Sequence, residues 1–515
     1  MAIPWWRRGA IYQIYPRSFS DSNGDGVGDL RGIVERLDYL VDLGIAGMWL
    51  SPFFRSPMAD FGYDIEDYCA VDPIFGTLDD FDLLIQEAHA RGIRLLVDFV
   101  PNHTSDRHEW FVASRSSRQS PKRDWYVWRD GRGSSGPPNN WRSSFATPGP
   151  AWTRDAATGQ WYLHSFLPEQ PDLNWENPAV EAAMHEVLRF WCDRGVDGFR
   201  LDVVQKIAKD PLLRDAQPGK PATWEDWQPT IHERLRRLRA VVDDYPDRVL
   251  VGEVYILDLP RVMTYVNTGD QLHMAHNFVF VHLPWSATAF RKAIDDFEEL
   301  ATESAWPAWF LANHDHSRVA TRFGEPQART VLLMLYALRG TPFVYQGEEL
   351  GLPDAEIPPD RVIDVDGRDP ERSPVPWRPP SRAGAGAGFT SGEPWLPITS
   401  RAEELNVESQ ASDAGSTLCL SRRLAALRES EAALQGGSQR TLDAGDDLLA
   451  WLRVGDGQRL LAVANFSAAD RQLRLAPDLP GAAEVLLSTD PHRPAGQVSL
   501  QELVLTPSEG LLARL

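Results

Sequence analysis

The chain has 515 residues, of which 43% are hydrophobic and 24% charged, which excludes both a disordered chain and a small disulfide-stapled scaffold. Its 52 Lys and Arg against 73 Asp and Glu give a net charge of −21. A field of that sign repels phosphate backbones and anionic lipids, so we expect no nucleic acid or membrane partner and favour a neutral small ligand.

Three cysteines, Cys69, Cys192 and Cys419, are scattered along the chain. Their odd number and wide spacing fit neither a disulfide framework nor a zinc knuckle, so a reducing compartment is predicted. The first residues lack the apolar core of a signal peptide, and no run of about 18 apolar residues occurs. We therefore expect a cytoplasmic protein, present as a monomer or a small homo-oligomer.

Short apolar runs alternate with amphipathic helical patterns up to about residue 350, which is typical of parallel βα units. Eight runs are rich in Val, Ile, Leu and Phe, as strands buried on both faces require. The predicted strands are Ala10–Phe19, Gly47–Phe53, Arg94–Val100, Gly198–Val204, Val249–Tyr255, His276–Phe280, Pro307–Asp315 and Thr341–Glu349.

Helices are predicted between these strands. Apolar residues recur at helical spacing over Asp29–Gly44, and Gly44 ends that helix. Asn177 and Pro178 begin another helix as N-cap and first residue. Further helices are predicted near Glu325–Arg339 and Ser416–Arg428. Eight βα pairs in series predict an α/β fold, a closed (β/α)8 TIM barrel, with a doubly wound sheet as the alternative.

Three segments depart from the βα pattern. Residues 103–176, rich in Trp, Ser, Arg, Pro and Gly, form a long excursion after the third strand and are predicted to be a lid subdomain. Residues 350–410 should form an extended rim loop after strand eight. Short strands with turn signals, such as Asp456-Gly457, predict a C-terminal antiparallel β-sandwich domain over 430–515. The barrel then comprises 1–102 and 177–429.

Polar residues end several of the predicted strands. Asp98 ends the third, Arg200 and Asp202 the fourth, Glu253 the fifth and Asp315 the seventh. Because chemistry in a TIM barrel lies at the C-terminal strand ends, these side chains should converge at one mouth. Arg200 and Asp202, two residues apart, should both point into it.

Several carboxylates in one pocket fit glycoside cleavage. That reaction uses one carboxylate as nucleophile, one carboxylic acid to protonate the leaving oxygen, and further negative charge to stabilise a cationic sugar ring. The sequence has no His-Glu-x-x-His, no P-loop and no strand-to-helix Gly-x-Gly-x-x-Gly. Zinc, ATP and dinucleotide chemistry therefore lack their usual anchors.

These motifs resemble the α-amylase superfamily, glycoside hydrolase family 13, and within it the exo-acting α-glucosidase and oligo-1,6-glucosidase branch. The resemblance spans about residues 6–428. The matching motifs are Asp98-Phe-Val-Pro-Asn-His103, Gly198-Phe-Arg-Leu-Asp202, Gly252-Glu253, Asn313-His314-Asp315, Gln170-Pro-Asp-Leu-Asn174, Arg368-Asp-Pro-Glu-Arg372 and Tyr345-Gln-Gly-Glu-Glu349.

The resemblance implies a catalytic role for three acids: Asp202 as nucleophile, Glu253 as general acid and then base, and Asp315 as transition-state stabiliser. It also implies a set of substrate-binding residues, with the first three closing the pocket around the terminal glucose: Tyr63, Asp64, Arg372, Arg200, His103, His314, Phe145 and Phe166. A closed end implies removal of single terminal residues. Retention of configuration implies Asp202 and Glu253 carboxylates about 5–5.5 Å apart.

The loop from Asp21 to Asp29 places oxygen ligands at alternating positions, with glycines that turn the backbone, as a loop that wraps a hard cation does. The resemblance supports a structural Ca²⁺ or Mg²⁺ here, held by Asp21, Asn23, Asp25, the Val27 carbonyl and Asp29. The alternative is a run of Asx turns that caps the following helix.

We expect a retaining exo-α-glucosidase that acts on short oligosaccharides with α-1,6 or α-1,4 links. Val203, directly after Asp202, resembles the 1,6-preferring members, but one methyl-scale difference is worth only ~1–3 kcal/mol of discrimination. Two alternatives remain: a transglucosidase or sucrose isomerase that uses the same covalent intermediate, and a non-catalytic binding protein on the same barrel.

Overall fold

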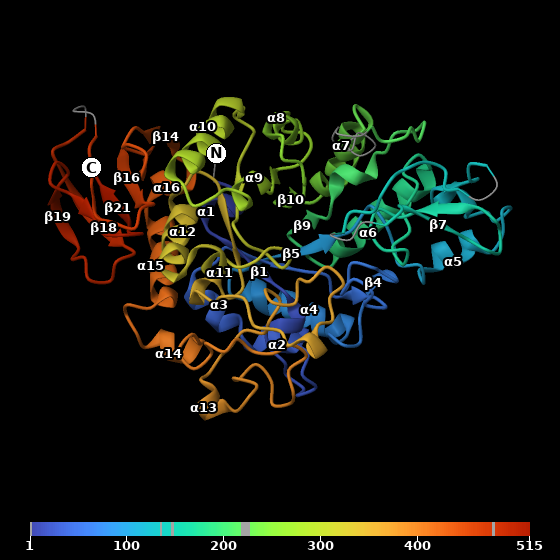
Figure 1. Ribbon diagram of the computed structural model, residues 1–515, viewed down its shortest axis with the longest axis horizontal. Coiled ribbons are helices and arrows are strands. Elements are labelled where there is room, and N and C mark those ends of the chain that lie inside the picture. Colours follow the sequence, from blue (N-terminus) through green and yellow to red (C-terminus); the bar gives the residue numbers. More distant parts are fainter. Residues whose placement is uncertain (1–2, 134–135, 146–148, 218–226, 476–478) are drawn as a thin grey trace.

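The computed structural model describes residues 3–133, 136–145, 149–217, 227–475 and 479–515. Figure 1 shows a central body of strands and helices, with a C-terminal sheet at one end and a small subdomain carrying β7 at the other.

A parallel eight-stranded sheet forms the centre, in the order β11-β10-β9-β5-β2-β1-β13-β12. A parallel bridge between His276 and Ala308 joins its two edges, so the sheet closes into the predicted barrel. The strands are β1 (Ile11–Ile14), β2 (Gly47–Leu50), β5 (Arg94–Phe99), β9 (Gly198–Leu201), β10 (Val249–Gly252), β11 (Met274–Ala275), β12 (Ala308–Trp309) and β13 (Thr341–Tyr345).

Helices surround this sheet, and their apolar faces pack on the outward-facing strand residues in one continuous core (Figure 1). Asn177 caps α6 as the sequence predicts, and Ser416, where another predicted helix begins, caps α15. The main outer helices are α2 (Leu30–Glu35), α3 (Leu37–Leu43), α4 (Leu78–Ala90), α6 (Pro178–Asp193), α7 (Thr230–Asp243), α8 (Leu259–Met263), α10 (Ala287–Leu300), α12 (Glu325–Ala337) and α15 (Thr417–Ser430).

The structure shortens several predicted strands: Ala10–Phe19 ends at Ile14, Pro307–Asp315 at Trp309 and Thr341–Glu349 at Tyr345, because the chain turns into loops or 3-10 helices there. It also corrects two further elements. The helix expected over Asp29–Gly44 is divided at Arg36 into α2 and α3, and Gly44 ends α3 in a left-handed conformation with φ +74°. In place of the strand expected over His276–Phe280, the structure has the shorter strand β11 (Met274–Ala275), which ends before His276. Asn277 accepts a hydrogen bond from the Val279 amide and begins a helix, α9 (Phe278–Val281), so local capping outweighs the β propensity of the apolar run.

The excursion after β5 carries a small sheet of its own. Three antiparallel strands lie in the order β6 (Trp128–Arg129), β8 (Trp161–Leu163), β7 (Trp152–Arg154), next to helix α5 (Glu109–Arg115). A cluster of buried side chains holds this subdomain together: Val127, Trp141, Ala151, Trp152 and Leu163. We call it the lid.

The C-terminal unit is a six-stranded antiparallel sheet that is buried on both faces. Trp451 and Leu460 pack toward the barrel helices, while Leu452 and Leu461 belong to a separate core beneath a two-stranded ribbon. Both central residues of the turn Asp456-Gly457 have positive φ, as a tight hairpin requires. The strands are β14 (Ser438–Leu442), β15 (Leu448–Gly455), β16 (Gln458–Asn465), β18 (Ala482–Ser488), β19 (Gly496–Ser499) and β21 (Gly510–Arg514), with the ribbon β17 (Arg471–Gln472) and β20 (Val504–Leu505).

The segment after β13 runs mostly as irregular chain along the barrel rim, with short helices α13 (Pro380–Ala383) and α14 (Val407–Ala411) before α15. We call its residues 350–410 the rim loop. Across the part of the chain that is described, none of the helices has both the length and the apolar character needed to cross a bilayer.

Candidate active site

Neighbouring barrel strands bring the predicted polar residues together. Asp98 on β5 pairs in register with Arg200 on β9, and Val251 on β10 pairs with Arg200 from the other side. Asp202 and Glu253 follow directly after β9 and β10. Because these three strands are adjacent and parallel, their ends place the side chains at one mouth of the barrel.

The Arg200 guanidinium, only 1% exposed, lies at the centre of the site. Its Nη1 donates to Asp98 Oδ1 at 2.8 Å and to Asp202 Oδ1 at 2.7 Å, and its Nη2 contacts Glu253 Oε2. Two carboxylates that share one guanidinium lie side by side. The expected nucleophile and the expected acid are therefore adjacent.

The electrostatics of these acids follow from burial. Burial, reinforced by the charge of Glu253, raises the pKa of Asp202 well above its ordinary value, although Arg200 acts in the opposite direction. Burial likewise raises the pKa of Asp98 to about 6. A cluster that holds several carboxyl groups around one cation favours keeping a proton among them, as acid–base chemistry requires.

The backbone beside Asp202 is strained. Val203 has φ +34° in the left-handed region, which is unusual for a β-branched residue. In this conformation its amide donates to Glu253 Oε2 at 3.2 Å. Unusual backbone angles of this kind concentrate at functional sites, and Val203 also lines the cavity described below.

Asp315 lies in a separate, cationic environment. Its carboxylate accepts from Arg372 Nη2 at 2.8 Å and from Arg368 Nη1 at 3.1 Å, with His314 Nε2 at 3.2 Å. Burial opposes its ionisation, but His314 and the two arginines outweigh burial and lower the pKa of Asp315 below its ordinary value. Asp315 is therefore held as an anion, whereas burial favours the protonated form of Asp202.

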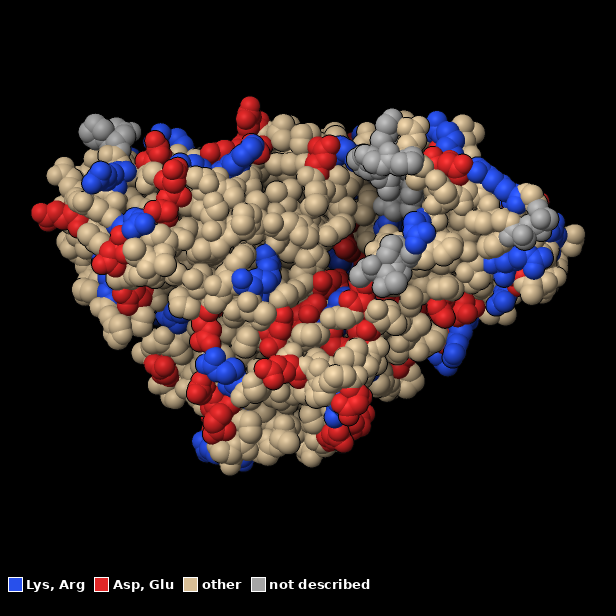
Figure 2. All heavy atoms as spheres, in the orientation of Figure 1, with Lys and Arg blue, Asp and Glu red and all other residues tan. Residues whose placement is uncertain are grey.

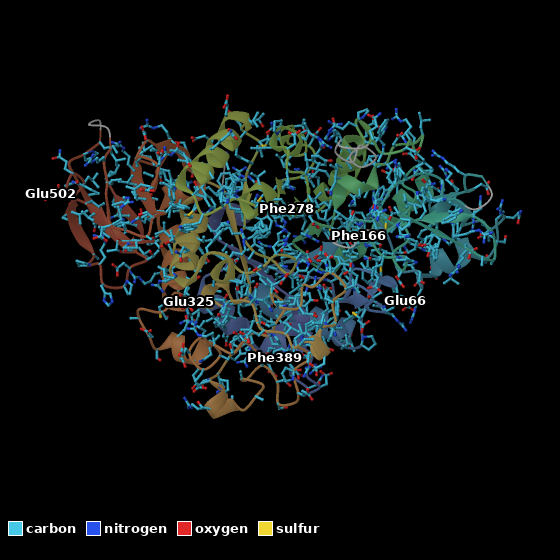
Figure 3. All side chains as sticks on the ribbon, viewed as in Figure 1. Glu66, Phe166, Phe278, Glu325, Phe389 and Glu502 are labelled. Carbon is cyan, nitrogen blue, oxygen red and sulfur yellow. The ribbon has the colours of Figure 1, made fainter. Side chains whose placement is uncertain are left out.

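A cavity of about 530 Å³ opens over these groups. Seven of the predicted site residues line it: Tyr63, His103, Phe145, Phe166, Asp202, Glu253 and Asp315. Phe166 lies where the lid meets the barrel (Figure 3). Burial lowers the pKa of His103 to about 4, so its imidazole is a neutral hydrogen-bonding group at physiological pH.

The predicted His314 lies directly behind the cavity. Its Nε2 is 2.7 Å from the Tyr63 hydroxyl, and the two rings stack with centroids 5.5 Å apart. The imidazole is fully buried, and burial lowers its pKa well below the ordinary value. His314 therefore lies outside the cavity lining and positions two residues that belong to it, Tyr63 and Asp315.

Two of the residues expected to close the pocket do not reach the cavity. Asp64 is fully buried and accepts from Ser56 Oγ at 3.0 Å and from the amides of Ala59 and Asp60 at 2.9 Å each, so it organises its own loop. Arg372 is also buried, with Nε donating to the His314 carbonyl and Nη2 to Asp315.

A different pair closes that end. Asp60 Oδ1 accepts from Arg368 Nη2 at 2.7 Å, Asp60 Oδ2 accepts from Gln170 Nε2 at 2.9 Å, and both Asp60 and Arg368 line the cavity. Each member lies four residues before the residue that the sequence singled out: Asp60 before Asp64, and Arg368 before Arg372. The resemblance located the loop around Asp64, but which acid of this loop faces the cavity depends on how the loop folds.

Other lining residues were not predicted as binding residues: Ser144, Val203, Gln205, Lys206, Tyr255, His316 and Asp366. Most follow a catalytic residue within a few positions. Their place just beyond the strand ends is the signal that identifies them as neighbours of the site, since barrel loops start there.

The loop from Asp21 to Asp29 shows the hydrogen bonds of consecutive turns. Asp21 Oδ1 accepts from the amides of Asn23 at 2.9 Å and Gly24 at 2.7 Å, and Asp25 Oδ1 accepts from the Val27 amide at 2.8 Å. Asp29 caps α2 by accepting from the Gly32 amide. Of the residues that the structure describes, no three His, Cys, Asp or Glu lie close enough together to hold a metal.

Comparison with known proteins agrees with this geometry. The model of the alpha amylase catalytic domain matches residues 13–437. A probable alpha-glucosidase of Rhizobium meliloti (strain 1021) is 42% identical over 91% of each chain. The trehalose-6-phosphate hydrolase of Escherichia coli (strain K12) is 40% identical over 90% of this chain and 91% of its own.

Among solved structures, that of an alpha-glucosyl transfer enzyme, XgtA, superposes with a TM-score of 0.91 at 40% identity and covers 100% of both chains. The chain belongs to the alpha-amylase family of glycoside hydrolases, as the motifs predicted.

Proposed function

We propose that the protein is a retaining, exo-acting α-glucosidase that removes terminal α-linked glucose from short oligosaccharides. The observation that carries the proposal is the buried Arg200 guanidinium that holds Asp202 and Glu253 side by side at a cavity closed by Asp60 and Arg368. The relatives named for α-glucoside chemistry support the same reaction.

The geometry assigns a role to each acid. Asp202 attacks the anomeric carbon while the protonated Glu253 gives its proton to the departing glycosidic oxygen, which forms a glucosyl ester and releases the aglycone. Glu253, now a carboxylate, takes a proton from water as that water attacks the ester and frees Asp202. Asp315, kept anionic by two arginines, stabilises the positive charge on the ring in both steps.

Replacing the nucleophile tests this assignment. Asp202→Asn should reduce kcat on p-nitrophenyl α-glucoside about a thousandfold, which corresponds to ~4 kcal/mol of transition-state stabilisation. The smaller Asp202→Gly, supplied with azide, should regain activity and release a β-glucosyl azide, because azide would attack from the face that the carboxylate occupied. An Asp202→Asn enzyme that keeps more than a tenth of the wild-type kcat would falsify the assignment.

The charges around the cavity favour an uncharged substrate over a sugar phosphate. Five acidic side chains line it (Asp60, Asp202, Glu253, Asp315 and Asp366) against two cationic ones (Lys206 and Arg368). When Arg200 and Arg372, which contact these acids from behind the lining, are counted as well, the acids still outnumber the cations by one. Figure 2 shows acidic side chains gathered around the hollow near the middle of this face. A surplus of negative charge in a partly desolvated cavity repels a phosphate group.

We therefore expect kcat/KM for trehalose, maltose or isomaltose to exceed that for the corresponding 6-phosphates by at least tenfold, with a gap that narrows as salt is added. Asp366→Asn, which removes a rim charge, should narrow the same gap. A preference for the phosphorylated sugars would assign this chain the activity named for its Escherichia coli relative.

Transfer to a sugar acceptor, including isomerisation of sucrose, is the second candidate, because the same glucosyl ester serves both outcomes and the relative XgtA is named for glucosyl transfer. Product analysis from concentrated maltose and sucrose distinguishes them: free glucose that rises in step with substrate loss indicates hydrolysis, and new disaccharides or trisaccharides indicate transfer. A purely binding protein would leave every substrate intact.

We propose further that the loop Asp21–Asp29 binds a structural Ca²⁺ or Mg²⁺, for which Asp21, Asp25 and Asp29 would have to turn from the backbone amides that they contact and converge on the ion. Its donors, Asp21, Asn23, Asp25, Asp29 and the Val27 carbonyl, are all oxygens, which these hard cations prefer. EDTA should lower the melting temperature, and Ca²⁺ or Mg²⁺ should restore it; an Asp25→Ala variant should show neither effect. If neither EDTA nor added metal changes the melting temperature, the loop binds no ion and is a run of Asx turns.

A cytoplasmic location is also proposed, because the free cysteines Cys69, Cys192 and Cys419 suit a reducing compartment. Fractionation of the producing cells tests it.

A further inference from the structure

A second cavity of about 530 Å³ lies on the lid, directly beside the catalytic one. The two cavities share Phe145 and Phe166. Adjacent rim-loop residues divide between them: Val365 lines the second and Asp366 the first. The second cavity is lined by Ser143, Phe145, Gly149, Pro150, Trp152, Thr153, Arg154, Trp161, His164, Phe166, Leu167, Pro168 and Val365. We call it the lid groove.

Two phenylalanine rings are common to the linings of both cavities, and we call this pair of rings the partition. The centroids of the two rings are 5.5 Å apart. Each ring also contacts a residue that lines the catalytic cavity. The Arg368 guanidinium lies 5.4 Å from the Phe145 centroid, and the His103 ring lies 5.2 Å from that of Phe166. Both rings therefore contribute to the wall that the two cavities share.

The partition lies at the closed end of the catalytic cavity. Arg368, which contacts Phe145, also forms the 2.7 Å ion pair with Asp60. Gln170, which donates to Asp60, also accepts from the amide of Leu167, a residue of the lid groove. Val203 and Tyr255, next to the nucleophile and the acid, line the catalytic cavity but not the groove. The groove is therefore on the side of the terminal glucose, away from the aglycone.

We propose that Phe145 and Phe166 are specificity-determining residues that confine the enzyme to an unsubstituted terminal glucose by separating this cavity from the lid groove. This inference rests on the proposed α-glucosidase function. Without the two rings, a substituent on the terminal glucose, such as one more sugar, would enter the groove, where Trp161 and Trp152 provide aromatic surface and Arg154 and His164 provide polar groups.

The test compares p-nitrophenyl α-glucoside with its 4,6-O-ethylidene derivative, in which the glucose carries a blocking group. The measured quantity is the ratio of kcat/KM for the blocked substrate to kcat/KM for the free one. This ratio should rise at least tenfold in Phe145→Ala/Phe166→Ala, even if activity on both substrates falls. With p-nitrophenyl α-maltoside, the double variant should release maltose, which the wild type does not.

Val365→Ala is the matched control, because Val365 lines the groove but not the partition and is 63% exposed; its ratio should equal that of the wild type. If the double variant is too slow to assay, calorimetric titration of the blocked substrate in an Asp202→Asn background, which cannot form the glucosyl ester, should show affinity gained on removing the rings. A ratio within twofold of wild type, or no gain in affinity, overturns the proposal. A wild type inactive on p-nitrophenyl α-glucoside overturns the proposed function instead, and the titration still tests the partition.

Discussion

At the scale of single residues, two aspartates that lie four residues apart in one loop have different tasks. Asp60 pairs with Arg368 in the cavity, whereas Asp64 accepts hydrogen bonds from its own loop and is fully buried. Burial raises the pKa of Asp64 to about 6. Substitution at each position should therefore affect a different property of the enzyme.

Asp60→Asn should lower kcat/KM about a hundredfold with little change in melting temperature, because it weakens a charged contact at the closed end. Asp64→Asn should instead destabilise the fold by ~1–3 kcal/mol, since its amide group would face backbone donors. Kinetics and thermal melts of the two variants check both expectations. The reverse pattern, full stability but lost activity in Asp64→Asn, would restore the assignment made from the motif.

At the scale of elements, the chain just after β13 carries a buried acid that the reaction does not use. Glu348 opens a short 3-10 helix, and its Oε2 accepts from the Tyr345 amide at 2.9 Å. Burial raises the pKa of Glu348 to about 8. Between its ordinary value and about 8 the folded protein thus holds a proton that the unfolded chain releases, so this group makes stability fall as pH rises through that window.

Glu348→Gln should remove that dependence, because the amide keeps an acceptor for Tyr345 and carries no charge. The difference in melting temperature, variant minus wild type, should be about 2 °C larger at pH 8 than at pH 5. Thermal melts at both values measure the effect. Glu303→Gln, an exposed position, is the control and should show no such trend; a flat difference for Glu348→Gln would mean that Glu348 is ionised in the folded state.

At the scale of the whole molecule, aromatic stacking joins the C-terminal sheet to the barrel. Phe466, just after β16, stacks on Trp285 with centroids 4.2 Å apart and lies 5.4 Å from the ring of Phe290 on α10. Buried Arg453 on β15 adds polar contacts by donating to carbonyls of α12 and of the turn before β14, among them Ala337 and Gly437. The C-terminal sheet therefore packs against the barrel helices and stabilises them through residues that do not line the catalytic cavity.

Phe466→Ala should destabilise the protein by about 3 kcal/mol, because it leaves a gap against Trp285. The kcat on p-nitrophenyl α-glucoside at 25 °C should stay unchanged, since Phe466 does not line the catalytic cavity. Chemical denaturation and kinetics measure the two effects. Val454→Ala, at an exposed position of β15, should change neither; a Phe466→Ala enzyme as stable as wild type would show that the sheet docks without this contact.

The sequence by itself determined the barrel, the separate C-terminal sheet and the acids at the strand ends. These features depend on periodicity, on turn chemistry and on the alternation of side chains along a strand, all of which are local. Asp98, Arg200, Asp202 and Glu253 converge because parallel strands end at one face, so knowing the strands was enough to place them.

Only the tertiary structure decided which loop residues face the cavity. Asp60 and Asp64 carry the same carboxyl group in one loop. The contacts of Asp64 with Ser56, Ala59 and Asp60 turn it inward, while Asp60 pairs with Arg368 at the cavity. The lid groove behind Phe145 and Phe166 likewise forms only where the lid meets the barrel. Irregular loops take their side-chain directions from long-range contacts, and those contacts leave no periodic signal in a sequence.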